Sequence, residues 1–337
     1  MSLSADLPVS VLDLVPVGEG VDAAEAVASS LTLARRADEL GFTRYWLAEH
    51  HNMPGIASSA PPVMIAAVAA ATRRIRVGSG GVMLPNHAPL VVAEQFGTLA
   101  ALHPGRIDLG LGRAPGTDQF TARALRREAT PSADDFPEQL GELGAFLAGQ
   151  WPDGHPYGAI KAVPHASEQP VIWLLGSSLY SAELAGLLGM PFAFAHHFSA
   201  RNTLPALARY RESFRPIGNL DTPHAMVTVN VVCAPTDDEA ERIALPAALS
   251  FLRLRQGRPG PLPTPETAAA HPWSAEERAF VAQRREGQAV GSPETVEKEL
   301  AALLADTAAD ELMVTAMLHD PADRIRSIEL VRELFAT

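Results

Sequence analysis

The sequence predicts an α/β protein in which eight parallel strands, each followed by a helix, close into one (β/α)8 TIM barrel. Short β-branched or aliphatic runs alternate with longer segments of helical apolar spacing. The 337 residues, 47 % of them hydrophobic, suffice for one large core. The loop after the first strand, Pro16 to Gly20, lacks the Gly-rich fingerprint of a doubly wound dinucleotide-binding sheet. We therefore expect residues 1–337 to form a single domain.

The first half of the chain contains four strands, predicted at Val9 to Val15, Tyr45 to Ala48, Ile75 to Met83 and Ile107 to Leu111. The helices between them are predicted at Ala23 to Leu40, Pro62 to Ala71 and about Pro89 to Leu102. The first helix ends at Gly41, the residue type that most often terminates a helix. From Arg113 to Pro137 the chain is polar and irregular, which is typical of a loop over an active site.

In the second half, strands are predicted at Val171 to Leu175, Phe192 to Ala195, Met226 to Cys233 and Glu311 to Thr315. Helices are predicted at Glu138 to Leu147, Leu179 to Leu188, Thr203 to Phe214, Asp237 to Leu254 and Ala322 to Phe335. A further helix begins at Pro293, with Ser292 as its N-cap. Between residues 255 and 290 we expect a second insertion, because the Pro-, Gly- and His-rich start of this segment comes before the last strand.

Composition excludes several classes of function. Acidic residues outnumber basic ones by 39 to 27, and no Lys/Arg cluster offers a surface for nucleic acid. The single Cys233 excludes an internal disulfide and a Cys-based metal cluster, and it indicates a reducing, cytoplasmic location. The N-terminus does not resemble a signal peptide, and no apolar run reaches the roughly 20 residues that cross a bilayer, so no membrane association is expected.

Strand ends carry the candidate chemistry, because active sites of such barrels lie at the carboxyl ends of the strands. His50 follows the second strand and can transfer protons near neutral pH, with Glu49 nearby to orient it. A structural histidine bonded to a backbone carbonyl is the alternative. Gly78 to Gly81 in the third strand allow a flat ligand to approach the backbone, or else mark a bulge.

The fourth and fifth strand ends are suited to an anion. Arg113 lies among glycines, including Gly112, and its guanidinium suits a terminal phosphate, although a surface ion pair is the alternative. Gly176, Ser177, Ser178 and Tyr180 join a strand directly to a helix, where backbone N–H groups and hydroxyls form an anion site. Plain N-capping by a serine would produce the same pattern.

His196 and His197 follow the sixth strand and are candidates for the substrate pocket. Together with His50 and His51 they raise the alternative of a metal-dependent hydrolase. The strand ends supply few carboxylates and no bridging Lys, which disfavours that alternative. We expect no metal.

At these positions the sequence resembles the bacterial luciferase-like monooxygenase family, in its single-chain branch. The stretches that carry the resemblance are Tyr45 to His51, Gly78 to Pro85, Pro104 to Gly110, Gly176 to Ser178 and Ala309 to Val314. They occur in order along nearly the whole chain.

The resemblance implies non-covalent FMN, with the ring against the third strand and the phosphate between the ends of the fourth and fifth. By position, His50 is the proton-transfer residue and Gly80-Gly81 the site of a non-prolyl cis peptide under the ring. The resemblance assigns the phosphate to Arg113, Gly176, Ser177, Ser178 and Tyr180. Gly112 stands where luciferase has a reactive cysteine, and Gly176 and Tyr180 replace a glutamate and a threonine, so light emission is not expected.

The implied activity is a monooxygenase in which reduced FMN activates O2 and one oxygen atom enters a small organic substrate. The chain has no nicotinamide fingerprint, so a separate flavin reductase is the expected source of reduced FMN. A homodimer through the helices after the second and third strands is also implied. Besides the metal-dependent hydrolase, the alternatives are an F420-dependent hydride-transfer enzyme and a non-catalytic flavin-binding protein.

Overall fold

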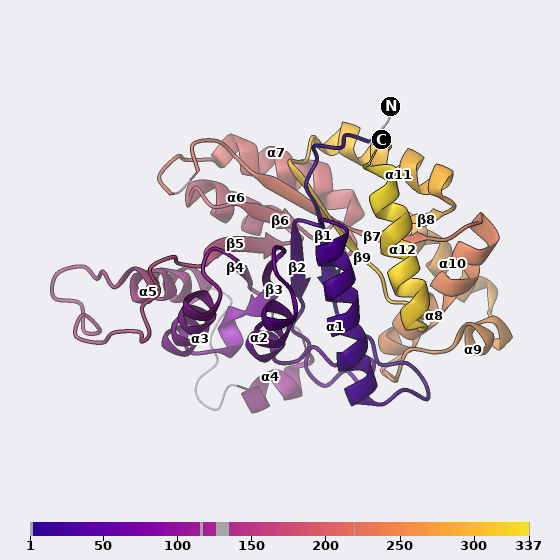
Figure 1. Cartoon of the computed structure of the whole chain (residues 1–337), viewed down its shortest axis with the longest axis horizontal. Coiled ribbons are helices and arrows are strands. Elements are labelled where there is room, and N and C mark those ends of the chain that lie inside the picture. The colour runs from indigo at the N-terminus through magenta and orange to yellow at the C-terminus, as the bar shows by residue number, and fades with distance from the viewer. Residues whose placement is uncertain (1–2, 115–116, 126–134, 219, 337) are drawn as a thin grey trace.

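Eight parallel strands close into a barrel in the computed structural model, which describes residues 3–114, 117–125, 135–218 and 220–336 (Figure 1). Each strand pairs with the next, and β9 pairs with both β7 and β1 to close the ring. The prediction of a (β/α)8 barrel is confirmed. The barrel strands are β1 (Val9–Asp13), β2 (Arg44–Leu47), β3 (Arg76–Met83), β4 (Ile107–Gly112), β5 (Val171–Gly176), β6 (Phe192–Phe194), β7 (Ala225–Cys233) and β9 (Glu311–Thr315).

Helices surround the barrel, and most begin and end within two residues of their predicted bounds (Figure 1). The α-helices are α1 (Ala23–Glu39), α2 (Pro61–Ala71), α3 (Pro89–Leu102), α4 (Gln119–Leu125), α5 (Phe136–Ala148), α6 (Leu179–Leu187), α7 (Thr203–Ser213), α8 (Asp237–Arg255), α9 (Pro265–Ala270), α10 (Ala275–Arg285), α11 (Pro293–Thr307) and α12 (Pro321–Leu334). Short 3-10 turns occupy Leu84–Asn86 and Ala200–Asn202.

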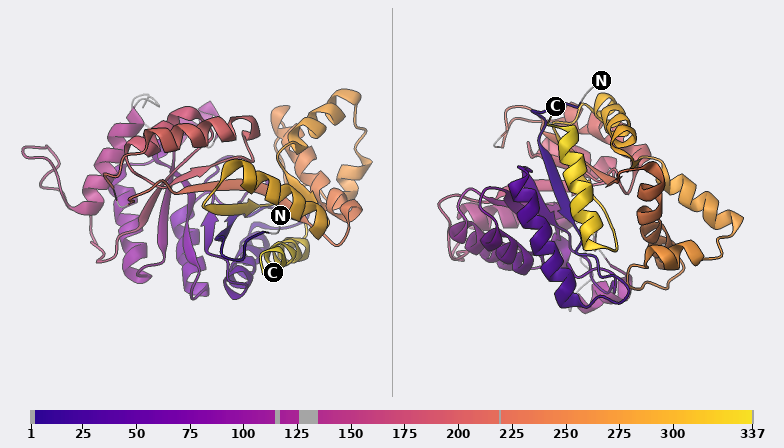
Figure 2. Two further views of the ribbon diagram at one scale, coloured as in Figure 1. Left: turned by 90° about the horizontal axis from the view of Figure 1, so that it is seen from above. Right: turned by 45° about the vertical axis from the view of Figure 1, so that its right-hand side comes forward.

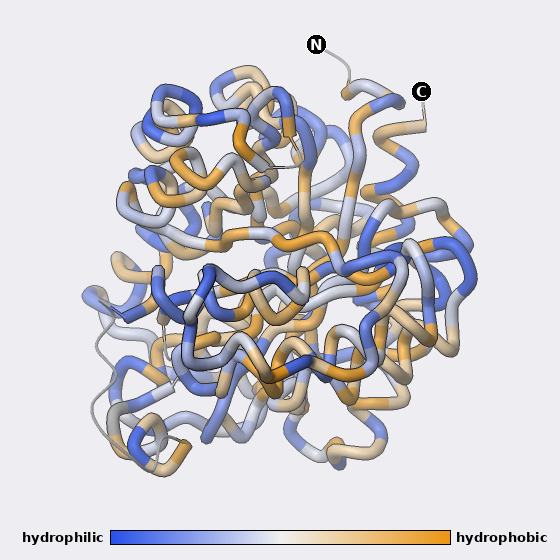
Figure 3. Tube along the Cα trace, turned by 90° about the vertical axis from the view of Figure 1, so that its left-hand side faces the viewer, coloured by the Kyte–Doolittle hydropathy of each residue, from blue (hydrophilic) through white to orange (hydrophobic). Residues whose placement is uncertain are grey.

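Side chains alternate between the two sides of the barrel wall, as the two-residue period of a strand requires. Outward-facing Val9, Val11 and Tyr45 belong to the large cluster between strands and helices. A separate interior cluster is formed by Leu12, Trp46, Ala48, Trp173, Ala193, Met226 and Met313. Hydrophobic stretches of the chain accordingly cross the centre of the molecule, whereas hydrophilic stretches lie mainly at its periphery (Figure 3).

The amino-terminal end of the barrel is closed by buried charges. Arg44 donates to Asp108 at 2.8 Å and to Glu311 at 2.9 Å, and these three side chains are 13 %, 0 % and 1 % exposed. Ser10 and Trp46 add hydrogen bonds to Glu311 and Asp108. Because buried ions are stable only when each is paired, this network ties β1, β2, β4 and β9 together at the end remote from the site.

Two predicted insertions contain more regular structure than expected. Helix α4 lies in the segment predicted as an irregular loop, of which residues 115–116 and 126–134 lie outside the described residues. Asp118 begins this helix by accepting hydrogen bonds from the N–H groups of Phe120 and Thr121, a cap that sequence reasoning missed.

The second insertion contains α9, α10 and a short strand, β8 (Ala289–Gly291), which pairs with β7 outside the ring. Ser274 and Glu277 form a capping box at the start of α10. Together α8, α9 and α10 form a projection on one side of the barrel (Figure 2, orange). None of the described helices is long and apolar enough to cross a membrane.

Candidate active site at the barrel mouth

A cavity of about 230 Å³ opens between the carboxyl ends of the strands and the helices α8 and α10. His50, His197 and Thr315 contribute to its wall from the ends of β2, β6 and β9. The opposite wall is largely apolar and comes from α8 and α10, with Ala244, Leu245, Ala248, Phe251 and Val281 among its residues. Polar groups on the barrel therefore face an apolar cover, an arrangement typical of small-molecule sites.

The loop after β2 holds His50 at the cavity. The backbone N–H of His50 donates to the carbonyl of Ser58, and the Ser58 hydroxyl donates to the carbonyl of Ala48 at 2.6 Å. The Nδ1 atom of His50 is enclosed and has no hydrogen-bond partner within the described part of the chain. Burial lowers the pKa of His50, although Glu49 opposes that shift. His50 is thus largely neutral near pH 7 and has an unused ring nitrogen.

Glu49 does not orient His50 by a hydrogen bond, so that expectation is wrong. Its fully buried carboxylate accepts from the rings of His51 and His87, each at 2.8 Å, and from the N–H of Met83 at 3.0 Å. Burial alone would raise the pKa of Glu49, but these hydrogen bonds lower it below its usual value. Glu49 positions the end of β3 and the loops beside it, and its influence on His50 is electrostatic.

His197 has a defined tautomer. Its Nδ1 lies 3.1 Å from the carbonyl oxygen of Thr228, which can only accept, so Nδ1 carries the proton and Nε2 is left as an acceptor. Burial lowers the pKa of His197 to about 4. At neutral pH a second uncharged imidazole therefore lines the cavity with His50.

His196 is not among the residues that line this cavity, so the structure does not support its assignment to the substrate pocket. The Nδ1 of His196 is 2.7 Å from the hydroxyl of Thr203, at the start of α7, and the ring packs close to Gly287. The side chain is 7 % exposed. His196 connects the end of β6 to α7 and to the loop before β8.

The Gly80-Gly81 peptide bond is cis, which confirms the conformation expected there. The pairing of β3 with β4 shifts register between Gly80 and Val82, so the bulge that was one explanation of the glycines is present. A Cβ on Gly81 would lie 2.7 Å from the carbonyl oxygen of Gly110, and one on Gly80 would lie 2.5 Å from Leu12 Cδ1. Packing against the backbone of β4 therefore requires glycine at position 81, whereas a Cβ at position 80 would require the Leu12 side chain to move.

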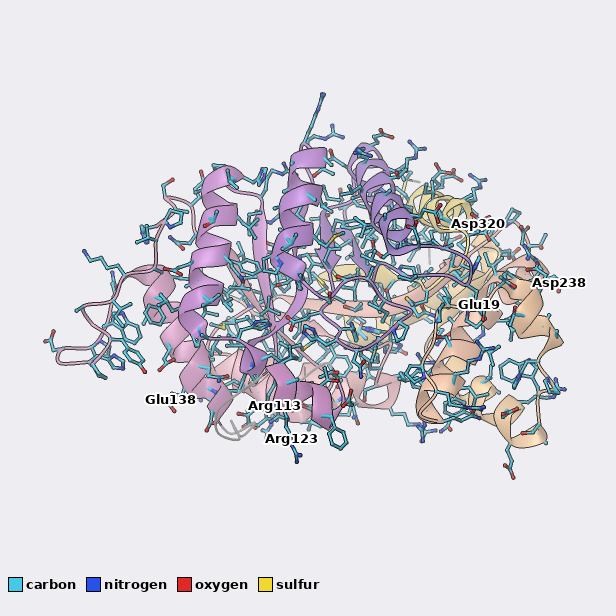
Figure 4. The ribbon with its side chains drawn as sticks, turned by 90° about the horizontal axis from the view of Figure 1, so that it is seen from below. Glu19, Arg113, Arg123, Glu138, Asp238 and Asp320 are labelled. Carbon is cyan, nitrogen blue, oxygen red and sulfur yellow. The ribbon has the colours of Figure 1, made fainter. Side chains whose placement is uncertain are left out.

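Arg113 and Tyr180, predicted from different strand ends, lie together. The Arg113 Cζ atom is 4.4 Å from the centroid of the Tyr180 ring, an arrangement in which the cation lies over the aromatic face. In Figure 4, Arg113 lies on the same side of the molecule as Arg123, a residue of α4. The surface ion pair considered for Arg113 is absent from the described residues. The guanidinium remains half-buried at the mouth, adjacent to Gly112 at the end of β4.

The start of α6 provides donors beside this arginine. Ser178 is the N-cap and accepts from the N–H of Ser181, so the plain capping interpretation holds for this serine. The N–H groups of Leu179 and Tyr180 and the hydroxyl of Ser177 have no hydrogen-bond partner among the residues described. A Cβ on Gly176 would lie 1.9 Å from Ser181 Oγ, which explains glycine at that position.

The order of the strands in the barrel relates the position of His50 to that of the Arg113–Tyr180 pair. The strands β2, β3, β4 and β5 are consecutive neighbours. The carboxyl end of β3 therefore lies between His50 on one side and Arg113 with Tyr180 on the other. A ligand that extends from the cavity to the start of α6 would cross the Gly80-Gly81 peptide. The loop after β4 is fastened to this mouth, because Thr117 donates to the carbonyl of His51 and Asn52 donates to Asp118.

Sequence reasoning missed several residues of the site. Thr315 ends a correctly predicted strand, and His87 follows another, but neither position has a distinctive motif. Arg284 and Phe251 line the cavity from outside the barrel strands, where no sequence signal indicated a site. Throughout the described residues, no three His, Cys, Asp or Glu side chains form a group that could hold a metal ion.

Comparisons with known proteins match nearly the whole chain. A family model described as luciferase-like monooxygenase matches residues 7–311. A luciferase-like monooxygenase of Escherichia coli strain K12 is 47 % identical over 325 residues, covering 96 % of each chain. N-acetyl-S-alkylcysteine monooxygenase of Bacillus subtilis strain 168 is 35 % identical over 325 residues, covering 96 % of this chain and 97 % of the relative. The crystal structure of apo-MsnO8 aligns with a TM-score of 0.89 and 40 % identity over 98 % of both chains.

Proposed function

Because this chain belongs to the luciferase-like monooxygenase family and is an oxygen-incorporating enzyme, we propose that it binds reduced FMN across the barrel mouth and oxygenates a small organic substrate. The observation that carries the proposal is the pairing of Arg113 with Tyr180 beside the start of α6. One cation and several unused donors meet there, at the end of the site remote from His50.

The donor set at the ends of β4 and β5 suits the phosphate of FMN. Arg113 supplies a guanidinium that can bind two phosphate oxygens, and Ser177 supplies a hydroxyl. The N–H groups of Leu179 and Tyr180, without a partner among the described residues, belong to the first turn of a nine-residue helix, where the helix dipole favours an anion. Ser178 contributes indirectly, since its hydroxyl holds this turn in place.

The ends of β3 suit the flavin ring. The cis peptide of Gly80-Gly81 lies between the phosphate donors and the cavity, and it carries no side chain that would block a flat ligand. When bound, reduced FMN would supply the electrons that activate O2. The neutral imidazole of His50, which lines the cavity, can hold or move a proton at the cavity side of the flavin ring.

The cavity beneath α8 and α10 is the proposed substrate site. Its apolar cover excludes water from the reacting groups, and His197 presents an uncharged acceptor to it. A relative that is 35 % identical is named N-acetyl-S-alkylcysteine monooxygenase, which supports thioethers as the first substrates to test. A separate reductase would supply the reduced flavin, because the first βα loop has no nicotinamide-binding motif.

A homodimer through α2 and α3 is also proposed. Helix α2 contains no charged residue although Val63 on its outer side is 70 % exposed. Val91 and Leu102 on the neighbouring α3 are 46 % and 63 % exposed. Apolar side chains exposed on two adjacent helices are typical of a surface that a second subunit covers.

A visible absorption titration with FMN tests the proposal, with F420 as the competing cofactor. We expect a perturbed flavin spectrum and saturable binding with FMN and a weaker response with F420. Preferential F420 binding would instead support the hydride-transfer alternative. Oxygen consumption with reduced FMN, measured with trial thioethers and compared with free reduced flavin, then separates a monooxygenase from a non-catalytic flavin-binding protein.

A further inference from the structure

Arg284 is a cation in the apolar cover of the cavity. It belongs to the last turn of α10 and lines the cavity with His50 and His197. Its Cζ atom lies 3.5 Å from the centroid of the Phe251 ring on α8, which also lines the cavity. This contact fixes the flat guanidinium group against the aromatic face, so the planar fork is held in place before any ligand arrives.

The charge of Arg284 is not balanced by a carboxylate within the described residues. The acidic residue of the same wall, Glu241, is paired with the neighbouring Arg285. His50 and His197 are largely uncharged at neutral pH, because burial lowers the pKa of both. The cavity wall therefore carries one uncompensated positive charge, and burial lowers the pKa of Arg284 as expected for a cation without a partner.

We propose that Arg284 binds the carboxylate of the substrate, and that the apolar remainder of the substrate lies against α8 near His50 and His197. This inference rests on the proposed function, since it assigns a substrate class to the same site. A guanidinium recognises a carboxylate through two parallel hydrogen bonds. Ala244, Leu245 and Ala248 supply the apolar surface for the rest of the molecule.

Arg284 is unsuited to the cofactor phosphate for two reasons. The predicted phosphate donors lie at the ends of β4 and β5, where Arg113 already supplies a cation, whereas Arg284 belongs to the cover on α10. The cavity of about 230 Å³ is also below the roughly 300 Å³ at which pockets for drug-sized ligands begin. Its size suits a small organic acid better than a complete flavin nucleotide.

Calorimetric binding of octanoate and octanamide tests the inference without requiring turnover. The two probes have the same chain and differ in charge. We expect the wild-type protein to bind octanoate about ten-fold or more tightly than octanamide. In Arg284→Met, which keeps an apolar stem against Phe251, the two affinities should fall within about two-fold, with octanamide unchanged. Arg284→Lys should retain part of the preference, because it keeps the charge but loses the planar fork.

Arg278→Met is the matched control, because Arg278 is an exposed residue of the same helix outside the cavity lining and its loss changes the net charge equally. This variant should keep the preference for octanoate. An octanoate affinity no higher than that of octanamide in the wild type, or a preference that survives in Arg284→Met, would overturn the inference.

A parallel FMN titration of each variant separates the two proposals. Unchanged FMN binding in Arg284→Met supports a substrate role, whereas loss of FMN binding would assign Arg284 to the cofactor and overturn the inference. If the wild-type protein binds no FMN, the proposed function fails, while the octanoate preference still decides whether Arg284 recognises a carboxylate.

Discussion

The guanidinium of Arg113 lies over the ring of Tyr180, with 4.4 Å between Cζ and the ring centroid. The two residues are 67 positions apart in sequence, yet β4 and β5 are neighbours in the barrel and their carboxyl ends bring both side chains to one rim. The contact joins the cation to the first turn of α6, where the N–H groups of Leu179 and Tyr180 have no partner among the described residues. An anion bound there would meet a positioned guanidinium and backbone donors together.

Arg113→Met should weaken FMN binding by about ten-fold or more while leaving riboflavin binding unchanged, because riboflavin lacks the phosphate. Fluorescence titration with both flavins measures the difference. Arg123→Met is the control, since Arg123 lies on α4 with its guanidinium over Phe120 and should affect neither ligand. Equal loss of FMN and riboflavin affinity in Arg113→Met would show that the residue does not act on the phosphate.

His50→Gln should retain FMN affinity within about two-fold but reduce turnover by about 10²-fold or more, the usual contribution of a positioned proton-transfer group. The rate with any accepted substrate and the FMN affinity are measured on the same preparation. Wild-type turnover in this variant would remove His50 from the chemistry.

His197 should make the protein less stable in mild acid. Its pKa is about 4 in the folded protein and near 6.5 when unperturbed, so the unfolded chain takes up a proton first as pH falls. The free energy of unfolding should therefore decrease between pH 6.5 and pH 4 and level off below pH 4, by at most about 3 kcal/mol.

Urea unfolding across that pH range, compared with His197→Asn, isolates this contribution. The variant should show a shallower dependence, because asparagine does not titrate. His165→Asn removes an exposed histidine and should leave the slope unchanged. If the unfolding free energies of the wild type and His197→Asn depend on pH in the same way, the pH dependence does not arise from His197.

Arg44→Met should lower the free energy of unfolding by about 3–5 kcal/mol, because it leaves the buried Glu311 and Asp108 carboxylates with fewer partners. Arg209→Met provides the contrast. Arg209 pairs with Glu183 at 3.7 Å on the surface, and a surface pair typically contributes less than about 1 kcal/mol. Chemical denaturation measures the loss of unfolding free energy in each variant. Similar losses in the two variants would argue against a structural role for the buried network.

Val63→Glu should convert the proposed dimer to a monomer, since it places a charge on the exposed apolar side of α2. Sedimentation velocity distinguishes the two states. Val163→Glu is the matched control, because Val163 is 68 % exposed but lies outside α2 and α3. A wild-type monomer would refute the dimer directly.

The fold was predictable because hydrophobic periodicity is a local signal that repeats along the chain. Every barrel strand was identified, and the turn glycines such as Gly41, with φ of +77°, marked helix ends correctly. Helices α4, α9 and α10 and strand β8 were not predicted. Helix α4 is short and begins at an Asp118 cap within a polar segment, α9 and α10 lie in a segment interpreted as an insertion because its start is rich in Pro, Gly and His, and β8 has three residues, too few for a periodic pattern.

The candidate site was predictable where residues stand at strand ends, as His50, His197 and Arg113 do. The partners of a side chain depend instead on three-dimensional neighbours. Because Glu49 precedes His50 in sequence, we expected Glu49 to orient His50. Its carboxylate instead accepts hydrogen bonds from the ring of His87 and from the N–H of Met83 at the end of β3. Arg284 could not be found in this way, because its importance arises from the position of α10 over a cavity formed by strands distant in sequence.

In the proposed function, the projection formed by α8, α9 and α10 contributes to the substrate site and the strand ends form the cofactor site. The strand ends supply the proposed cofactor contacts, whereas the wall opposite them comes from α8, the barrel helix after β7, and from residues 255–290, which form an insertion in the repeating barrel pattern. Exchanging residues 255–290 between relatives should therefore alter which molecules are accepted while leaving flavin binding in place. Under the proposed function, residues 255–290 would set part of the substrate choice without changing the strand ends that form the proposed cofactor site.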